Sequence, residues 1–284
     1  MLTINPKEVS VAVLHGYLQS SIAPRPIAFA STIDKDGKVN LSPFSFFNVF
    51  GTNPPTLIFS PNRRVRDGSQ KHTLENVLEH DEVVINMVDF AMVEQMSLAS
   101  CEYEKGINEF VKGGFTEAAS VMVKPPRVLE SKAAFECKVK QVIQMSQEGG
   151  SPNLVICEVV LAHFSEDILD ENGKIDQTKT DWVARLGGDW YVRASGDALF
   201  AVAKPSVHKG IGIDAIPDFI KNDSSFSGND LGRLGNIENL PTEEEIAIFI
   251  KENPSENFKE MAKKFLINGK IKEAWLALIS QSKF

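Results

Sequence analysis

The chain has 284 residues, of which 43% are hydrophobic and 24% charged, a balance typical of globular proteins large enough to bury a sizeable core. Its formal net charge of −8 argues against a general nucleic-acid binder, because such proteins are usually basic along one whole face. No apolar run reaches the length of a membrane span, the first residues lack a signal-peptide pattern, and the three cysteines are widely spaced. We therefore expect a cytoplasmic protein with reduced thiols that binds neither nucleic acid nor a membrane.

Most of the chain predicts short strands joined by turns. Asp36 and Gly37 indicate a hairpin turn, and the segment HTLENVLEH (72–80) predicts a helix with Thr73 as its N-cap. Frequent short strands with few helices favour an antiparallel barrel over a doubly wound sheet, and no glycine-rich nucleotide motif is present. Apolar runs bounded by turn residues predict strands at residues 26–33, 38–50, 56–60, 82–88, 134–145 and 153–167.

The last part of the chain differs in composition. Residues 206–240 are rich in Gly, Asn, Asp and Ser, which predicts an irregular connector. Beyond it, Thr242 and Glu245 form a capping box before an apolar helical pattern, and two further helical patterns follow. We expect residues 1–205 to form the main domain and residues 241–284 a small helical extension.

The loop SPNRRVRDGSQKHT (60–73) concentrates positive charge, with only Asp67 to offset it. It lies between a predicted strand and a predicted helix, where free backbone N–H groups and the positive end of a helix dipole can meet an anion. Read alone, the loop could be a phosphate site or a solvated basic turn. The groups available to a phosphate are Ser60, Asn62, Arg63, Arg64, Arg66, Lys71 and Thr73.

The segment NLSPFSFFNVF (40–50) mixes aromatic and polar side chains within one predicted strand. A planar heteroaromatic ligand would explain the mixture, because apolar side chains cover a ring face while hydroxyl, amide and backbone groups meet its edge atoms. The alternative is an aromatic core strand whose polar residues face water.

The sequence offers no candidate for acid, base or nucleophilic catalysis by the protein itself. The five histidines have no metal-ligand spacing, and no serine lies in a G-x-S-x-G motif. Carboxylates are scattered along the chain. This pattern favours a protein that binds a flat cofactor and lets the cofactor carry the chemistry, with no metal site.

Several segments resemble a known family when they are taken together. They are PRPIAFASTIDKDGKVNLSPFSFFNVFGTNPPTLIFSPNRR, KHTLENVLEHDEVVINMV, AFECKV, NLVICEVV and DWVARLGGDWYVR, in this order. They are similar to the flavin reductase-like family of FMN-binding split barrels, over about residues 10–205 and most densely over 24–88. The resemblance implies a mainly β protein: a six-stranded antiparallel split barrel with flanking helices, to which this chain adds its C-terminal α-helical extension. It also implies a homodimer with FMN near the subunit interface.

The resemblance further implies which positions contact FMN. The isoalloxazine ring is expected along the segment that contains Asn40, Ser42, Pro43, Phe44, Ser45, Phe46 and Asn48. The FMN phosphate is expected at Ser60, Asn62, Arg63, Lys71 and Thr73. Arg185 and Gly187 match a family signature near the end of the barrel, and Arg25 is a candidate at the same pocket.

The activity implied by the resemblance is hydride transfer from NADH or NADPH to N5 of FMN, followed by electron transfer to an unassigned acceptor. Short-chain reductases of this family carry an Asp-His pair where this chain has Ser151, Pro152 and Asn153. This departure supports a second hypothesis, in which the protein stores or senses FMN and turns over little dinucleotide.

Overall fold

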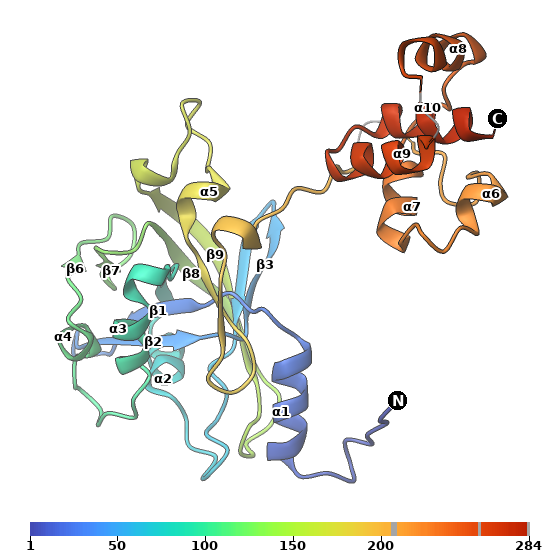
Figure 1. The fold of residues 1–284 in the computed structure, drawn as a ribbon. Coiled ribbons are helices and arrows are strands. Elements are labelled where there is room, and N and C mark those ends of the chain that lie inside the picture. Colours follow the sequence, from blue (N-terminus) through green and yellow to red (C-terminus); the bar gives the residue numbers. More distant parts are fainter. Residues whose placement is uncertain (206–208, 255–256, 283–284) are drawn as a thin grey trace. The chain divides into compact units, whose positions relative to one another are not determined.

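The chain forms two compact units in a computed structural model that describes residues 1–205, 209–254 and 257–282 (Figure 1). Unit 1 comprises Met1–Phe200 and unit 2 comprises Ala201–Phe284, each with its own hydrophobic core. The division therefore falls a few residues before the predicted boundary at 205. Residues 206–208, with which the predicted connector begins, lie outside the described residues.

Unit 1 is built on one large antiparallel sheet. Its strand order is β2-β1-β5-β8-β9-β4-β3, so the sheet has seven strands where six were predicted. The seven strands are β1 (Ala28–Ile33), β2 (Val39–Phe44), β3 (Phe47–Thr52), β4 (Pro55–Phe59), β5 (Glu82–Asn86), β8 (Ala133–Gln144) and β9 (Asn153–Phe164).

The extra strand arises because the segment 38–50, predicted as one strand, forms both β2 and β3. These are the two edge strands of the sheet, yet only Ser45 and Phe46 separate them in the chain. Since the three steps from Phe44 to Phe47 span at most about 11 Å, the two edges must meet at this point. The sheet therefore curls into a barrel that is split between β2 and β3.

Two pairs of short strands and several helices complete unit 1. Helices α2, α3 and α4 lie on the side of the sheet formed by β1 and β2 (Figure 1). The short strands are β6 (Glu117–Ala118) with β7 (Arg127–Val128), and β10 (Val183–Arg185) with β11 (Tyr191–Arg193). The helices are α1 (Val11–Ser21), α2 (His72–Glu79), α3 (Val93–Leu98), α4 (Glu109–Gly113) and α5 (Gln177–Thr180), with 3-10 turns at Phe90–Met92, Glu166–Ile168 and Gly196–Ala198.

Strand β1 is buried on both faces, and this position joins two clusters of core residues. Ala28 and Ala30 face the barrel interior, which also contains Phe59. Ile27 and Phe29 face the opposite way, into the cluster beneath α3 and α4. Because successive side chains of a strand point to opposite faces, the continuous apolar run from residue 27 can fill both clusters.

Helix α1 was not predicted, because its apolar residues define no buried stripe. None of its residues is buried, and Val11, Tyr17, Leu18 and Ile22 at or beside it are all exposed. Ser10 caps its start by accepting a hydrogen bond from the backbone N–H of Val13. Among the described residues, no helix is both long enough and apolar enough to cross a membrane.

The described part of unit 2 contains helices joined by irregular segments, without strands. The capping box of Thr242 and Glu245 is confirmed at the start of α8. Within the predicted irregular connector at 206–240, α6 and α7 were not predicted, and they contribute Ile220 and Leu234 to the core of unit 2. Residues 209–217, 222–227 and 235–240 form neither helix nor strand. The helices are α6 (Asp218–Lys221), α7 (Gly228–Leu234), α8 (Glu243–Glu252), α9 (Phe258–Ile267) and α10 (Ile271–Gln281).

Trp275 joins the helices of unit 2. It is fully buried on α10, and its indole N–H donates a hydrogen bond of 2.9 Å to the carbonyl oxygen of Leu234 at the end of α7. We predict that Trp275→Ala destabilises unit 2 by about 3–5 kcal/mol, because it leaves a large cavity and an unpaired carbonyl group. Chemical unfolding followed by far-ultraviolet circular dichroism measures this loss.

The matched control is Trp190→Ala, since the side chain of Trp190 is 75% exposed in unit 1. This variant should unfold as the unchanged protein does. Equal stability of the Trp275 and Trp190 variants would contradict the buried position of Trp275.

Candidate functional site

A cavity of about 370 Å³ lies beside the crossing between β2 and β3. Its volume is within the range of small-molecule sites. It brings together the end of β2 and the loop that follows β4, the two segments singled out in the sequence. Eight of the predicted site residues line it: Pro43, Phe44, Ser45, Phe46, Ser60, Asn62, Arg63 and Lys71.

The basic loop is held against the hairpin between β8 and β9. The backbone N–H of Arg63 donates to the carbonyl oxygen of Ser151 at 3.0 Å, and the N–H of Gly150 donates back to Arg63 at 3.1 Å. The Ser60 hydroxyl donates to Asn62 Oδ1 at 2.6 Å and accepts from the N–H of Asn153 at 3.0 Å. These bonds fix the first residues of the loop in the cavity wall.

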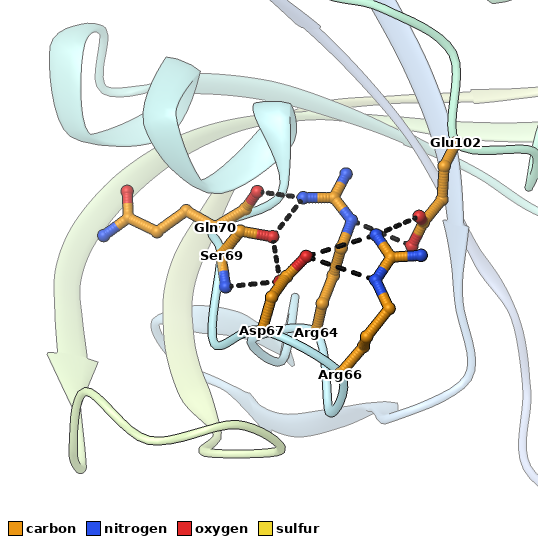
Figure 2. A network of polar contacts seen from close by, with 6 residues as sticks. All are labelled: Arg64, Arg66, Asp67, Ser69, Gln70 and Glu102. Carbon is orange, nitrogen blue, oxygen red and sulfur yellow. Dashed lines mark hydrogen bonds and ion pairs between the residues drawn. The ribbon is translucent and has the colours of Figure 1, made fainter.

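Two of the four basic side chains are already paired with acids, as Figure 2 shows. Arg64 Nε lies 2.8 Å from Glu102 Oε1, and Arg66 Nη2 lies 3.3 Å from Glu102 Oε2. Arg66 also pairs with Asp67 Oδ2 at 3.1 Å, and its side chain is 74% exposed. Asp67 in turn accepts hydrogen bonds from Ser69, so one counterion comes from within the loop and the other, Glu102, from the segment after α3.

Arg63 is buried and holds the loop together. Its guanidinium donates to the carbonyl oxygen of Gly68 at 2.9 Å and to the side chain of Gln147. Arg63 thus stabilises the loop through Nη1 and Nη2, and its buried Nε has no hydrogen-bond partner among the described residues.

Lys71 differs from the three arginines. Its ammonium group forms no hydrogen bond or ion pair with any residue that the structure describes. Partial burial lowers the pKa of Lys71, the nearby Arg64 lowers it further, and Glu102 acts in the opposite direction. A bound anion would counteract both lowering effects, so Lys71 is the cation best placed to receive one.

The start of α2 adds to the positive character of the cavity. Lys71 is its N-cap residue, and no side chain caps the first turn. The first backbone N–H groups of a helix lack partners within it, and the helix dipole is positive at this end. The predicted N-cap role of Thr73 is wrong, because Thr73 is the second residue of the helix and its side chain is buried.

Asn40 and Thr73 lie below the cavity and are joined to each other. Asn40 Nδ2 donates to Thr73 Oγ1 at 2.9 Å, and both side chains are buried. Asn76 Nδ2 donates to Thr32 Oγ1 at 3.0 Å, which extends the polar network from α2 to β1. This network ties the first turn of α2 to the strand that forms the other wall of the cavity.

The remaining predicted residues on β2 and β3 separate into two groups. Ser42, with Asn40, lines a hollow of about 20 Å³ that also contains Lys71 and Glu102, so it borders the main cavity. Asn48 is exposed on β3 and accepts a hydrogen bond of 2.8 Å from the N–H of the next residue, Val49. Asn48 does not line the cavity.

Arg25 and Arg185 lie beside the same end of β2 as the main cavity, since Arg25 Nε donates to Ser45 Oγ at 3.4 Å and Arg185 pairs with Arg25 through the backbone. Arg185 lines a second cavity of about 200 Å³ that shares Pro43 and Ser45 with the first. Arg25 is buried, and its side chain donates to the carbonyl oxygens of Ile22 and Leu186. A Cβ atom on Gly187 would lie 2.1 Å from Ser20 Oγ, so this glycine allows α1 to approach. Arg25 and Gly187 therefore act on the position of α1.

Sequence reasoning missed several residues of the site. His15 reaches the cavity from α1, Gly150 from the hairpin between β8 and β9, and Glu102 from the segment after α3. Glu102 is the acidic residue among them, and it lies 38 and 36 residues along the chain from Arg64 and Arg66, with which it pairs. No motif in the sequence marks this pairing, because the position of Glu102 depends on the tertiary structure.

Glu109 supports β2 beside the small hollow that it lines together with Ser42 and Lys71. It is 4% exposed at the start of α4, and its Oε2 accepts a hydrogen bond of 3.0 Å from the N–H of Leu41. Burial raises the pKa of the Glu109 carboxyl group, although the backbone N–H groups of Leu41 and of Glu109 itself oppose this effect. Leu41 belongs to β2, so Glu109 holds the strand that lines the cavity.

The fold and the sequence place the chain in a known family. The family described as flavin reductase like domain matches residues 20–179. A relative from Aquifex aeolicus, an uncharacterized protein, is 38% identical over 196 residues, which cover 69% of this chain and 97% of the relative. The chain therefore belongs to the flavin reductase-like family.

Two solved structures extend the comparison. Nitrilotriacetate monooxygenase component B from Bacillus cereus is 28% identical, with a TM-score of 0.65 and coverage of 72% of this chain and 98% of that one. A protein with a split barrel domain from Shewanella frigidimarina has the same fold, with 24% identity, a TM-score of 0.60 and coverage of 72% and 100%. The family match ends at residue 179, so unit 2 lies outside it.

The buried carboxyl group of Glu109 makes stability depend on pH. Because its pKa is raised in the folded state, ionisation disfavours folding, and this cost develops as the pH rises from about 4 through the folded-state pKa. Glu109→Gln keeps an acceptor for Leu41 and removes the charge. We predict that the difference in melting temperature between this variant and the unchanged protein shifts in favour of the variant as the pH rises from 5 to 8.

Glu104→Gln is the control, because Glu104 is exposed on the preceding loop. Its melting temperature should differ from that of the unchanged protein by the same amount at both pH values. A difference for Glu109→Gln that stays constant with pH would contradict a raised pKa.

Proposed function

We propose that this protein binds FMN in the 370 Å³ cavity and acts as an NAD(P)H-dependent flavin reductase. The observation that carries the proposal is the juxtaposition of Lys71, whose ammonium group is unpaired among the described residues, with the apolar and hydroxyl-bearing end of β2. One side of the cavity suits a phosphate and the other suits a flat ring. Membership of the flavin reductase-like family supports the same assignment.

The phosphate half of the site would be formed by the loop and by the start of α2. Lys71 would supply the charge, Arg63 Nε a buried donor without another partner, and the first turn of α2 its free backbone N–H groups. The side-chain amide of Asn62 would add a donor from the same wall, held in place by the Ser60 hydroxyl, which donates to Asn62 Oδ1. These donors suit a phosphate monoester, which carries about −1.5 to −2 charges at neutral pH.

The ring half of the site would be formed by Pro43, Phe44, Ser45 and Phe46. Phe46 is 36% exposed beside the cavity, whereas Phe44 is anchored in the barrel core, with its ring centroid 5.6 Å from that of Phe59. The anchored ring fixes the backbone between the two positions. Ser45 can then present its hydroxyl and backbone groups to the heteroatoms at a ring edge.

Bound FMN would supply the redox chemistry by accepting a hydride from NADH or NADPH and passing electrons to an acceptor. The residues of the chain would bind and orient it. Backbone N–H groups near Ser45 would stabilise negative charge that develops on the ring, and the cations of the loop would hold the phosphate. Catalytic acid, base or nucleophile roles are not needed for the hydride step, so we assign none.

We propose a cytoplasmic homodimer in which FMN lies near the subunit interface. The apolar residues left exposed on α1 and β3 support this arrangement, since Tyr17, Leu18, Val49 and Phe50 are each 47–64% exposed. Exposed apolar surface of this kind often marks a protein interface. Nitrilotriacetate monooxygenase component B belongs by name to a system with another component, so a partner that consumes reduced flavin is the acceptor we favour.

The second candidate function is storage or sensing of FMN with little turnover of dinucleotide. Residues 151–153, which depart from the reductase pattern, favour this second function, because Ser151 and Asn153 are buried. Asn153 Nδ2 donates to the carbonyl oxygen of Pro61 at 2.9 Å. These side chains support the cavity wall and do not present groups to a dinucleotide.

The visible spectrum of the purified protein and the mass of the released chromophore test FMN binding. Stopped-flow mixing with NADH or with NADPH then separates the two functions. A reductase loses its oxidised-flavin absorbance within seconds, whereas a storage protein keeps it for minutes. A colourless protein that does not bind added FMN would contradict both.

Lys71→Gln tests the phosphate site. We predict that FMN binding weakens about tenfold or more, because a hydrogen bond to a charged group contributes about 1.5–3 kcal/mol. Riboflavin lacks the phosphate, so its affinity should stay unchanged. Fluorescence quenching of each flavin measures both affinities. Substituting Lys71 alone tests the phosphate contact more specifically than substituting Arg63 and Lys71 together, since Arg63 also stabilises the loop.

Lys105→Gln is the matched control, because Lys105 is exposed and paired with Glu75 at 2.7 Å. It removes the same charge from outside the cavity. An equal loss of FMN affinity in the Lys105 and Lys71 variants would show a general charge effect and would refute the phosphate contact.

A further inference from the structure

Glu102 is an acidic group in the wall of a cavity that otherwise carries positive charge. Both of its carboxylate oxygens are used, one by Arg64 at 2.8 Å and the other by Arg66 at 3.3 Å (Figure 2). It lines the main cavity and also the adjoining hollow with Lys71. An acid in this place lowers the affinity for any anion beside it, so its presence needs an explanation.

The exposure of the charged residues orders them from the inside of the cavity to its mouth. Arg63 is 8% exposed and the side chain of Arg64 is 16% exposed, whereas those of Glu102 and Arg66 are 46% and 74% exposed. Lys71 is partly buried. A single phosphate held by Lys71 and Arg63 would therefore lie inside, and any group attached beyond it would pass Glu102.

We propose that Glu102 makes the site selective for a flavin with one terminal phosphate over a flavin joined through a pyrophosphate to a nucleotide. This inference rests on the proposed function. The second phosphate of FAD would meet the Glu102 carboxylate at the mouth of the cavity. Glu102 would also keep Arg64 and Arg66 from binding this phosphate, because their guanidinium groups are already engaged by Glu102 and Asp67.

FMN and FAD form a suitable pair of probes, since each carries about two negative charges at pH 8. They differ in where the charges lie, because one of the two charges of FAD is displaced outward along the pyrophosphate. The ratio of their affinities therefore reports the field at the mouth of the cavity. Riboflavin, without a phosphate, reports the ring half of the site alone.

Glu102→Gln tests the proposal on protein freed of endogenous flavin, with the affinities for FMN, FAD and riboflavin measured by fluorescence quenching. We expect the affinity for FAD relative to FMN to rise about tenfold, equivalent to about 1.4 kcal/mol, with riboflavin unchanged. Glu102→Lys should raise the ratio further. The control is Glu104→Gln, because Glu104 is exposed on the same loop and does not line the cavity.

An unchanged ratio of FAD to FMN affinity in Glu102→Gln would overturn the role of Glu102, as would an equal rise in the Glu104 variant. Neither result would contradict the proposal that the protein binds FMN. If none of the three flavins binds the unchanged protein, the proposed function fails and this inference fails with it.

Discussion

The crossing from β2 to β3 through Ser45 and Phe46 is the constraint on which the candidate site depends. Because the chain passes from one edge of the sheet to the other in two residues, the edges meet there and the barrel stays split beside them. The backbone N–H of Ser60 donates to the carbonyl oxygen of Phe46 at 2.9 Å, so the basic loop begins at the same point. The two segments that we propose to bind the flavin ring and its phosphate are thus adjacent as a direct result of the topology.

Much of this arrangement could be predicted from the sequence, because it depends on local patterns. The apolar run of β1 predicts a buried strand, and the basic loop lies between a strand and a helix, as its sequence predicts. The crossing itself could not be predicted. In the run 38–50, the residues on both sides of Ser45 favour a strand, and only the contacts of β3 with β4 show that two strands are present.

The roles of individual side chains could be predicted less well than their location. Arg64 and Lys71 look alike in the sequence, but Glu102 neutralises the first and leaves the second available. Asn40 and Thr73 are polar residues near a cavity, yet each satisfies the other below its surface. Such partners come from distant parts of the chain, and a buried polar group is positioned by whichever partner the fold provides.

The burial of β1 on both faces has a consequence for how unit 1 unfolds. Ala28 and Ala30 lie in the barrel interior, and Phe29 between them packs against Phe115 in the other cluster, with ring centroids 5.2 Å apart. A strand shared in this way cannot leave one cluster and remain in the other. The barrel and its covering helices are therefore joined into a single cooperative folding unit, with β1 as the shared element.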